Sequence, residues 1–124
     1  MRALLIPVGS AGDVHPYVGL ALALRDRGHD VTIATNAYFR PLIDRLGLRL
    51  IPVGTVEQYE TVTAHPNLWH RRKGLNVIAG AVRAASADLY RLVQEHGVGD
   101  DTVVIAPGLA FAARTAQETL GIRL

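Results

Sequence analysis

Short apolar runs alternate with segments of helical spacing along the chain, and this alternation limits the possible folds more than any other feature. The run at residues 3–8 is apolar on both faces, as in a strand buried within a parallel sheet. The segments that follow it are a helix at 16–27, a strand at 30–35, a helix at 37–46 and a strand at 48–53. Three strands separated by helices predict right-handed βαβ units and therefore an α/β fold with a parallel sheet.

The second half of the chain continues the alternation after a polar interruption. Residues 54–73 are polar and contain Pro66, which predicts a long loop that includes a short helical piece. The later segments are a helix at 75–95, a strand at 102–106, a helix at 109–120 and the beginning of a fifth strand at 122–124. We therefore expect residues 1–124 to form a single domain that is part of a longer protein, or part of a longer domain.

The composition excludes several classes of protein. The chain of 124 residues is 49% hydrophobic and 19% charged, which is typical of a globular domain. It contains no cysteine, so a disulfide framework, a thiolate metal site and a cysteine nucleophile are excluded. The net charge of +2 is too small to indicate a nucleic-acid partner. No apolar run approaches the roughly 20 residues that span a bilayer, so we expect a soluble, cytoplasmic protein without a transmembrane segment.

The segment after the first predicted strand, residues 9–16, is the most informative one for function. Its sequence, Gly-Ser-Ala-Gly-Asp-Val-His-Pro, combines two glycines with the carboxylate of Asp13 and the imidazole of His15. Ligands of open α/β sheets bind at the carboxyl ends of strands, beside helix N-termini. A dinucleotide site is disfavoured, because the loop has only G-x-x-G and the second strand ends at Asn36 without an acidic residue. A P-loop is excluded because G-K-[ST] is missing.

Three elements with matching spacing give the chain a family resemblance. The loop at 9–16 is followed by the apolar run Gly-Leu-Ala-Leu-Ala-Leu at 19–24 and by Arg-Gly-His-Asp-Val-Thr at 27–32. Residues 66–70 and 103–120 continue the pattern. The whole chain resembles the N-terminal, acceptor-side domain of GT-B glycosyltransferases. The nearest groups are the sterol and antibiotic glycosyltransferases and the rhamnosyltransferase of rhamnolipid synthesis. The resemblance implies a Rossmann-like parallel sheet with helices on both faces.

The resemblance also implies a function. Residues 1–124 would be the acceptor-binding domain of a truncated, inverting hexosyltransferase, which moves a sugar from a nucleoside-diphosphate sugar to a hydroxyl of a lipophilic acceptor. The C-terminal domain that binds the donor is absent, so the fragment alone should be inactive. We expect no cofactor and no metal, because the five histidines lack metal-ligand spacing. The alternatives are a non-catalytic acceptor-binding module and a Rossmann-like nucleotide-binding domain.

Asp13 and His15 are the candidate catalytic residues. In relatives with Gly-His in this loop the histidine is the general base, and the resemblance places Asp13 at that position. Aspartate as a residue type has a pKa of about 3.9, whereas histidine titrates closer to neutral pH, so His15 is the rival base. The third possibility is structural, with either side chain capping the following helix.

Seven further residues are expected to bind the acceptor, namely Gly9, Ser10, Gly12, Trp69, His70, Gly108 and Leu109. Most of them follow predicted strands and so belong to the carboxyl edge of the sheet. Trp69 would pack either on the acceptor or on the long helix. His70, His65 and the basic run at 71–73 would line the acceptor cleft, meet an anionic headgroup as a peripheral membrane contact, or form a solvated loop.

Overall fold

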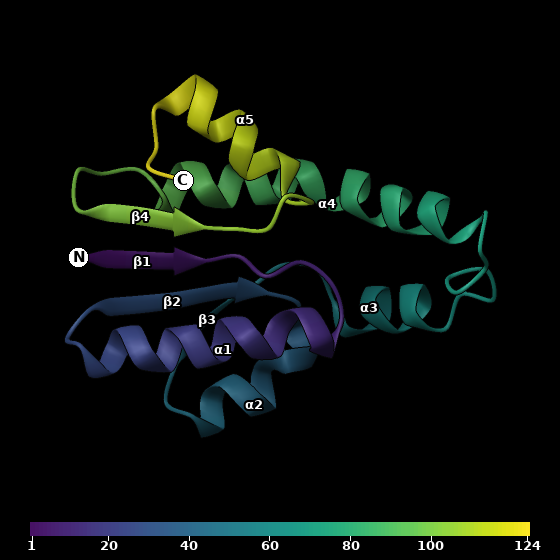
Figure 1. The fold of residues 1–124 in the computed structure, drawn as a ribbon, viewed down its shortest axis with the longest axis horizontal. Coiled ribbons are helices and arrows are strands. Elements are labelled where there is room, and N and C mark those ends of the chain that lie inside the picture. Colours follow the sequence, from purple (N-terminus) through teal and green to yellow (C-terminus); the bar gives the residue numbers. More distant parts are fainter.

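Four parallel strands form the sheet at the centre of the structure, a computed structural model that describes residues 1–124. In chain order they are β1 (Arg2–Leu5), β2 (Asp30–Thr35), β3 (Arg49–Pro52) and β4 (Thr102–Ile105). Their order across the sheet is β3-β2-β1-β4, so β1 lies between β2 and β4 (Figure 1). The register pairs Arg2 with both Asp30 and Thr102, which places the carboxyl ends of these strands at a common edge.

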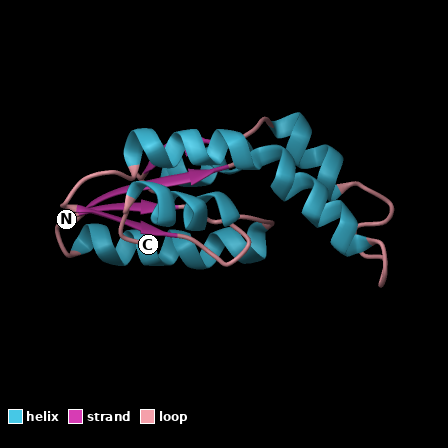
Figure 2. Ribbon diagram, turned by 90° about the horizontal axis from the view of Figure 1, so that it is seen from above, coloured by secondary structure: helices cyan, strands magenta, loops and turns pink.

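Helices cover both faces of the sheet (Figure 2). One layer contains α1 (Ala11–Asp26), the short 3₁₀ helix η1 (Ala37–Phe39) and α2 (Arg40–Arg45), and the other contains α4 (Gly74–His96) and α5 (Phe111–Leu120). In β1, Ala3 and Leu5 belong to the core beneath α1 and α2, while Leu4 and the following residue, Ile6, belong to the core beneath α4 and α5. The expected Rossmann-like α/β fold is thereby confirmed.

Helix α1 begins at Ala11, whereas the sequence pattern predicts a start at residue 16. The reason is Ser10, which has extended backbone and a backbone N–H bonded to the side chain of Asp13. Pro16 therefore lies inside the helix rather than in its first turn. Consequently Asp13 and His15 are helical residues, not members of a flexible loop.

The last residues of the chain adjoin β4. Val103 forms a parallel bridge with Arg123, and the N–H of Val104 donates to the carbonyl of Arg123 over 2.8 Å. The predicted beginning of a fifth strand is thus present as a single bridge beside β4.

Residues 56–80 form a projection, called the arm below, that extends past the carboxyl edge of the sheet (Figures 1 and 2). It comprises α3 (Val56–Thr63), a turn at 64–73 and the start of α4. Helix α3 begins with a reciprocal cap, in which the N–H of Thr55 donates to Gln58 Oε1 over 2.9 Å and the N–H of Gln58 donates to Thr55 Oγ1 over 3.2 Å. Gly74 is the one buried residue of the arm, so the arm has no core of its own.

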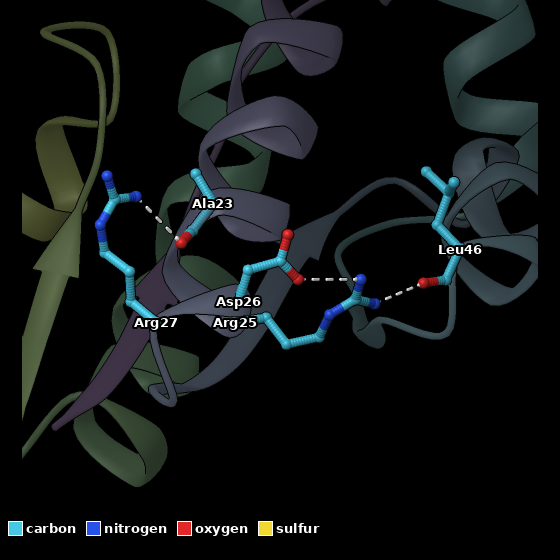
Figure 3. A network of polar contacts seen from close by, with 5 residues as sticks. All are labelled: Ala23, Arg25, Asp26, Arg27 and Leu46. Atoms are coloured by element: carbon cyan, nitrogen blue, oxygen red, sulfur yellow. Dashed lines mark hydrogen bonds and ion pairs between the residues drawn. The ribbon is translucent and has the colours of Figure 1, made fainter.

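The opposite end of α1 is tied to α2 by Arg25 (Figure 3). Its Nη1 donates to the carbonyl oxygen of Leu46 over 2.7 Å, and its Nη2 lies 3.5 Å from Oδ1 of Asp26. Arg27 instead donates to the carbonyl of Ala23 in its own helix over 3.2 Å. Because Leu46 follows α2, Arg25 joins the C-terminal ends of two helices on the same face.

Candidate functional site

The segment between β1 and α1 brings the carboxylate of Asp13 to the carboxyl end of β1. Gly9 has a φ of +132°, a conformation that residues with side chains rarely adopt. A Cβ atom added at Gly9 would lie 2.6 Å from Cγ of Asp13. Only glycine therefore leaves room for the carboxylate at this place.

Asp13 holds the start of α1. Its Oδ2 accepts hydrogen bonds from the backbone N–H of Ser10 over 2.9 Å and from the Ser10 hydroxyl over 3.4 Å. Both residues are exposed, and Oδ1 of Asp13 has no hydrogen-bond partner in the protein. The capping role considered for Asp13 is present in the structure, and it leaves one carboxylate oxygen free for a ligand.

His15 is not paired with Asp13. It lies two residues further along α1, and residues at that spacing do not face each other on a helix. His15 is exposed. Gly12 also lies in the first turn of α1. A Cβ atom added at Gly12 would have only Ser10 Oγ nearby, at 4.0 Å. The catalytic role of His15 and the binding role of Gly12 stay predictions.

Three aromatic rings gather after β2 and β3. Tyr38 stacks on Tyr59 of α3 with ring centroids 4.3 Å apart, and Phe39 meets both rings edge-on. Burial raises the pKa of Tyr59, and repulsion from Tyr38 and from Asp13 raises it further. Since Tyr38 is 47% exposed, the stack offers an aromatic surface to a ligand.

Asn36 fastens these aromatic segments together. Its Nδ2 donates to the carbonyls of Val53 over 3.3 Å and Thr55 over 2.9 Å, and its Oδ1 accepts from the N–H of Tyr38 over 2.9 Å. Asn36 follows β2, where a dinucleotide site would carry an acidic residue. Here the side chain is used to hold the loops after β2 and β3.

The loop between β4 and α5 lies beside the Gly9 segment, because β1 and β4 are neighbours and the N–H of Ile6 donates to the carbonyl of Ile105 over 2.8 Å. Gly108 is exposed and has open space around it. Leu109 is 44% exposed and Phe111 is 59% exposed. This loop therefore adds apolar surface next to the start of α1.

Trp69 and His70 belong to the turn at 64–73. This turn between α3 and α4 is the part of the arm farthest from the sheet (Figures 1 and 2). Trp69 is 88% exposed, so it does not pack on the long helix. Nδ1 of His70 accepts from the backbone N–H groups of Arg72 and Lys73, each over 3.1 Å, and so holds the turn that leads into α4. The structure does not bring these two residues together with Asp13, and their part in acceptor binding stays a prediction.

Two hollows of the surface lie at the opposite edge of the sheet. One, of about 230 Å³, is lined by the first residues of all four strands, Arg2, Asp30, Arg49 and Thr102, among others. The other, of about 440 Å³, lies between Arg25, His29 and Arg49. Neither hollow is lined by a predicted site residue.

No cluster of three or more histidine or acidic side chains is arranged to hold a metal ion. No helix combines the length and apolar character that crossing a membrane requires.

Comparison with known proteins decides the family. The model of the glycosyltransferase family 28 N-terminal domain matches residues 3–123. The chain belongs to this family. It is 32% identical over 115 residues to O-mycaminosyltylonolide 6-deoxyallosyltransferase of Streptomyces fradiae, covering 86% of this chain and 26% of that enzyme. It is 38% identical over 69 residues to a sterol 3-beta-glucosyltransferase of Pichia angusta, covering 54% of this chain and 6% of that enzyme.

A solved structure supports the fold of this family 28 domain. SsfS6, a glycosyltransferase of Streptomyces sp. SF2575, superposes with a TM-score of 0.70 over 98% of this chain and 37% of that protein, at 23% identity. The resemblance to sterol and antibiotic glycosyltransferases is confirmed, as is the GT-B fold class. The chain spans about a quarter or less of the length of the curated relatives named above.

The sequence pattern did not identify Tyr38 and Tyr59 as site residues. Both follow predicted strands, and the rule that parallel strands end at a common edge would have pointed to their loops. The stacking itself depends on α3. The polar composition of residues 54–73 gave no apolar periodicity from which the bounds of this helix could be predicted.

Proposed function

We propose that this family 28 domain holds the hydroxyl acceptor during an inverting transfer of a hexose from a nucleoside-diphosphate sugar. The observation that carries the proposal is the carboxylate of Asp13, which Ser10 fixes at the carboxyl edge of the sheet with Oδ1 free. Membership of a glycosyltransferase family supports sugar transfer as the reaction class.

Asp13 acts in this proposal as the general base. The acceptor oxygen forms a bond to the anomeric carbon while the bond from that carbon to the diphosphate oxygen breaks on the opposite face. The electron pair of the broken bond leaves with the nucleoside diphosphate, and the acceptor proton passes to Oδ1 of Asp13. A free alcohol is a much weaker acid than a carboxylic acid, so the proton moves late, after the acceptor oxygen has begun to bond to carbon.

The acceptor in this proposal is lipophilic. The loops that flank Asp13 expose apolar or aromatic side chains, namely Tyr38, Leu109 and Phe111, and clustered exposed apolar surface marks a binding site. The names of two relatives, which contain O-mycaminosyltylonolide and sterol, support this class of acceptor.

The nucleotide sugar is bound elsewhere in this proposal. The carboxyl edge has no P-loop, and the chain covers only 37% of SsfS6. We therefore propose that a donor-binding domain completes the active site and that residues 1–124 alone do not turn over substrate. The proposal also places the transfer in the cytoplasm.

The test is Asp13→Asn in an enzyme that carries this domain together with a donor-binding domain. Asparagine still accepts the hydrogen bond from Ser10 through its amide oxygen, so the fold is retained while the base is lost. We expect kcat to fall by about 10²-fold or more, with the thermal midpoint nearly unchanged. His15→Ala is the matched control and should leave kcat within a few-fold of wild type.

The capping bonds to Oδ2 of Asp13 favour one alternative, an acceptor-binding module without catalysis. If Asp13→Asn keeps full turnover, Asp13 is only a cap. If His15→Ala abolishes turnover, His15 is the base. If the complete enzyme binds a lipophilic alcohol in isothermal titration but transfers no sugar to it, the module is the better description.

A further inference from the structure

One amide side chain, that of Asn36, joins the backbones of the two stacked tyrosines. Its Oδ1 accepts from the backbone N–H of Tyr38 over 2.9 Å. Its Nδ2 donates over 2.9 Å to the carbonyl oxygen of Thr55, and the backbone N–H of Tyr59 donates to that same oxygen over 3.1 Å. Tyr38 follows β2 and Tyr59 belongs to α3, so the two rings come from separate segments. The side chain of Asn36 therefore fixes the backbone of one tyrosine relative to that of the other.

The same amide also holds the exit of β3. Nδ2 of Asn36 donates to the carbonyl of Val53 over 3.3 Å, and the N–H of Val53 donates to the carbonyl of Thr35 over 2.8 Å. The next residue, Gly54, passes so near that an added Cβ would lie 3.3 Å from Nδ2 of Asn36. Helix α3 buries no residue of its own. Its start is therefore held against the end of β2 by these polar bonds and by the aromatic stack.

An asparagine at position 36 supplies the groups that this junction needs. Its amide has one carbonyl oxygen and two N–H donors, and here the oxygen takes one backbone N–H while the nitrogen serves two backbone carbonyls. Aspartate would keep the acceptor but would set a negative charge against both carbonyl oxygens. Alanine would leave all three backbone groups without this partner. Because Asn36 is half-buried, water replaces these bonds only in part.

Tyr38, Phe39 and Tyr59 together are called the aromatic wall below. Phe39 is buried in the core beneath α1 and α2 and meets both tyrosine rings edge-on. Tyr59 is half-buried and stacks on Tyr38 with an interplanar angle of 20°. The wall is thus anchored in the core at Phe39 and exposes mainly the ring of Tyr38. A tyrosine ring offers a large contact area at a low cost in conformational entropy.

We propose that Asn36 is a positioning residue for the acceptor, which acts through Tyr38 by holding the aromatic wall in place. Asn36 does not touch the acceptor, whereas a ring of the acceptor packs on the exposed face of Tyr38. The segments after β1, β2 and β3 emerge at one edge of the sheet, and α3 lies past that edge (Figure 1). The wall therefore shares this edge with the segment that carries Asp13. The role rests on the proposed function, since it belongs to the same acceptor site.

The test compares two alcohols of similar lipophilicity, the ring alcohol β-naphthol and the open-chain alcohol n-heptanol. Their affinities for the purified chain are measured by isothermal titration. We expect Asn36→Ala to weaken the binding of β-naphthol by about 2- to 10-fold, the range that one aromatic contact contributes. The binding of n-heptanol should stay nearly unchanged, because an alkyl chain has no ring face to stack. A general loss of structure would weaken the binding of both alcohols equally.

Three further variants separate positioning from folding. Asn36→Asp keeps the acceptor for the N–H of Tyr38 but lacks both donors, so it should lose as much affinity for β-naphthol as Asn36→Ala. Tyr38→Ala removes a ring that is 47% exposed, which spares the core, and should give the same loss. Asn36→Ala/Tyr38→Ala should bind no more weakly than Tyr38→Ala alone, because Asn36 acts through that ring. Asn76→Ala, at an exposed asparagine of α4, is the matched control and should bind like the wild type.

Several results would overturn the role of Asn36. They are a wild-type chain that does not bind β-naphthol, an unchanged affinity in Asn36→Ala, equal losses for both alcohols, and additive losses in the double variant. In the complete enzyme, Asn36→Ala should raise KM for a ring-bearing alcohol by the same factor and leave kcat and the donor KM within a few-fold. A complete enzyme that binds the alcohols in the expected pattern but transfers no sugar overturns the proposed function, while the positioning by Asn36 stands.

Discussion

Two separate features of the structure require a glycine at position 9. The chain turns there with a φ of +132°, and the space that a side chain would occupy is filled by the carboxylate of Asp13. The same carboxylate takes the backbone N–H of Ser10. The position of the candidate base therefore depends on a residue that has no functional group. Gly9 leaves this space to the carboxylate, and its own contact with the acceptor stays a prediction.

Gly9→Ala should displace the Asp13 carboxylate and strain the backbone. We expect a loss of about 1–3 kcal/mol in the free energy of unfolding and a fall in turnover of the complete enzyme of about 10²-fold, the effect of a small misplacement of a reacting group. Chemical denaturation and steady-state kinetics measure the two effects. Gly19→Ala, at an exposed glycine of α1 with open space around it, is the control and should lower neither. Wild-type kinetics for Gly9→Ala would show that the placement of Asp13 does not matter.

Helices and strands with a clear apolar pattern could be predicted from the sequence. Helix starts that are set by capping side chains could not. Three of the four strands lie within their predicted segments, and β1 begins one residue ahead of its own, because buried parallel strands are apolar on both faces and are readily recognised. The start of α1 was missed, since Ser10 and Asp13 begin the helix ahead of Pro16. The buried stripe of α1 is Val14, Val18 and Ala21, a helical spacing of four and three residues.

Helix α3 was predicted only as a short helical piece within a loop. It buries no residue, so no apolar periodicity marks it, and its start is specified by the capping pair Thr55 and Gln58. The aromatic part of the candidate site depends on this helix through Tyr59. The sequence could place Asp13 at the carboxyl edge, but the stacking of Tyr38 on Tyr59 required the tertiary structure.

Arg25 provides an element-scale prediction. Its guanidinium joins the end of α1 to the free carbonyl of Leu46 after α2. Because the bond is charge-assisted but exposed, Arg25→Ala should lower the free energy of unfolding by about 0.5–1.5 kcal/mol. Arg27→Ala, which removes a bond within one helix, should cost less than about 0.5 kcal/mol. Thermal unfolding of both variants measures the difference, and equal midpoints would show that the link between α1 and α2 contributes nothing.

At the scale of the whole molecule, the composition makes tyrosine the main side chain that titrates at alkaline pH. The chain has a single lysine, Lys73, and its arginines stay protonated. Burial raises the pKa of Tyr17, and burial with repulsion from Tyr38 and Asp13 raises that of Tyr59, above the ordinary value of 10.0. Above pH 10 the unfolded chain therefore releases protons that the folded chain retains.

The stability of the whole domain should accordingly be complete below pH 10 and fall as the pH rises through the raised pKa values of Tyr17 and Tyr59. Denaturation curves at a series of alkaline pH values measure the slope. Tyr17→Phe/Tyr59→Phe should flatten the slope, whatever its effect on stability at neutral pH. An unchanged slope in this variant would mean that neither phenol is shielded in the folded state.

The common register of the strands has a consequence for engineering. The segments after β1, β2, β3 and β4 all emerge at one edge, while the sheet and its two cores lie behind them. Each segment is anchored by its own strand, so the segments after β2 and β4 can be exchanged with those of another family member without altering β1 or the first turn of α1, which carries Asp13. A small library of such loop grafts would vary the choice of alcohol while the chemistry at the carboxylate is inherited unchanged.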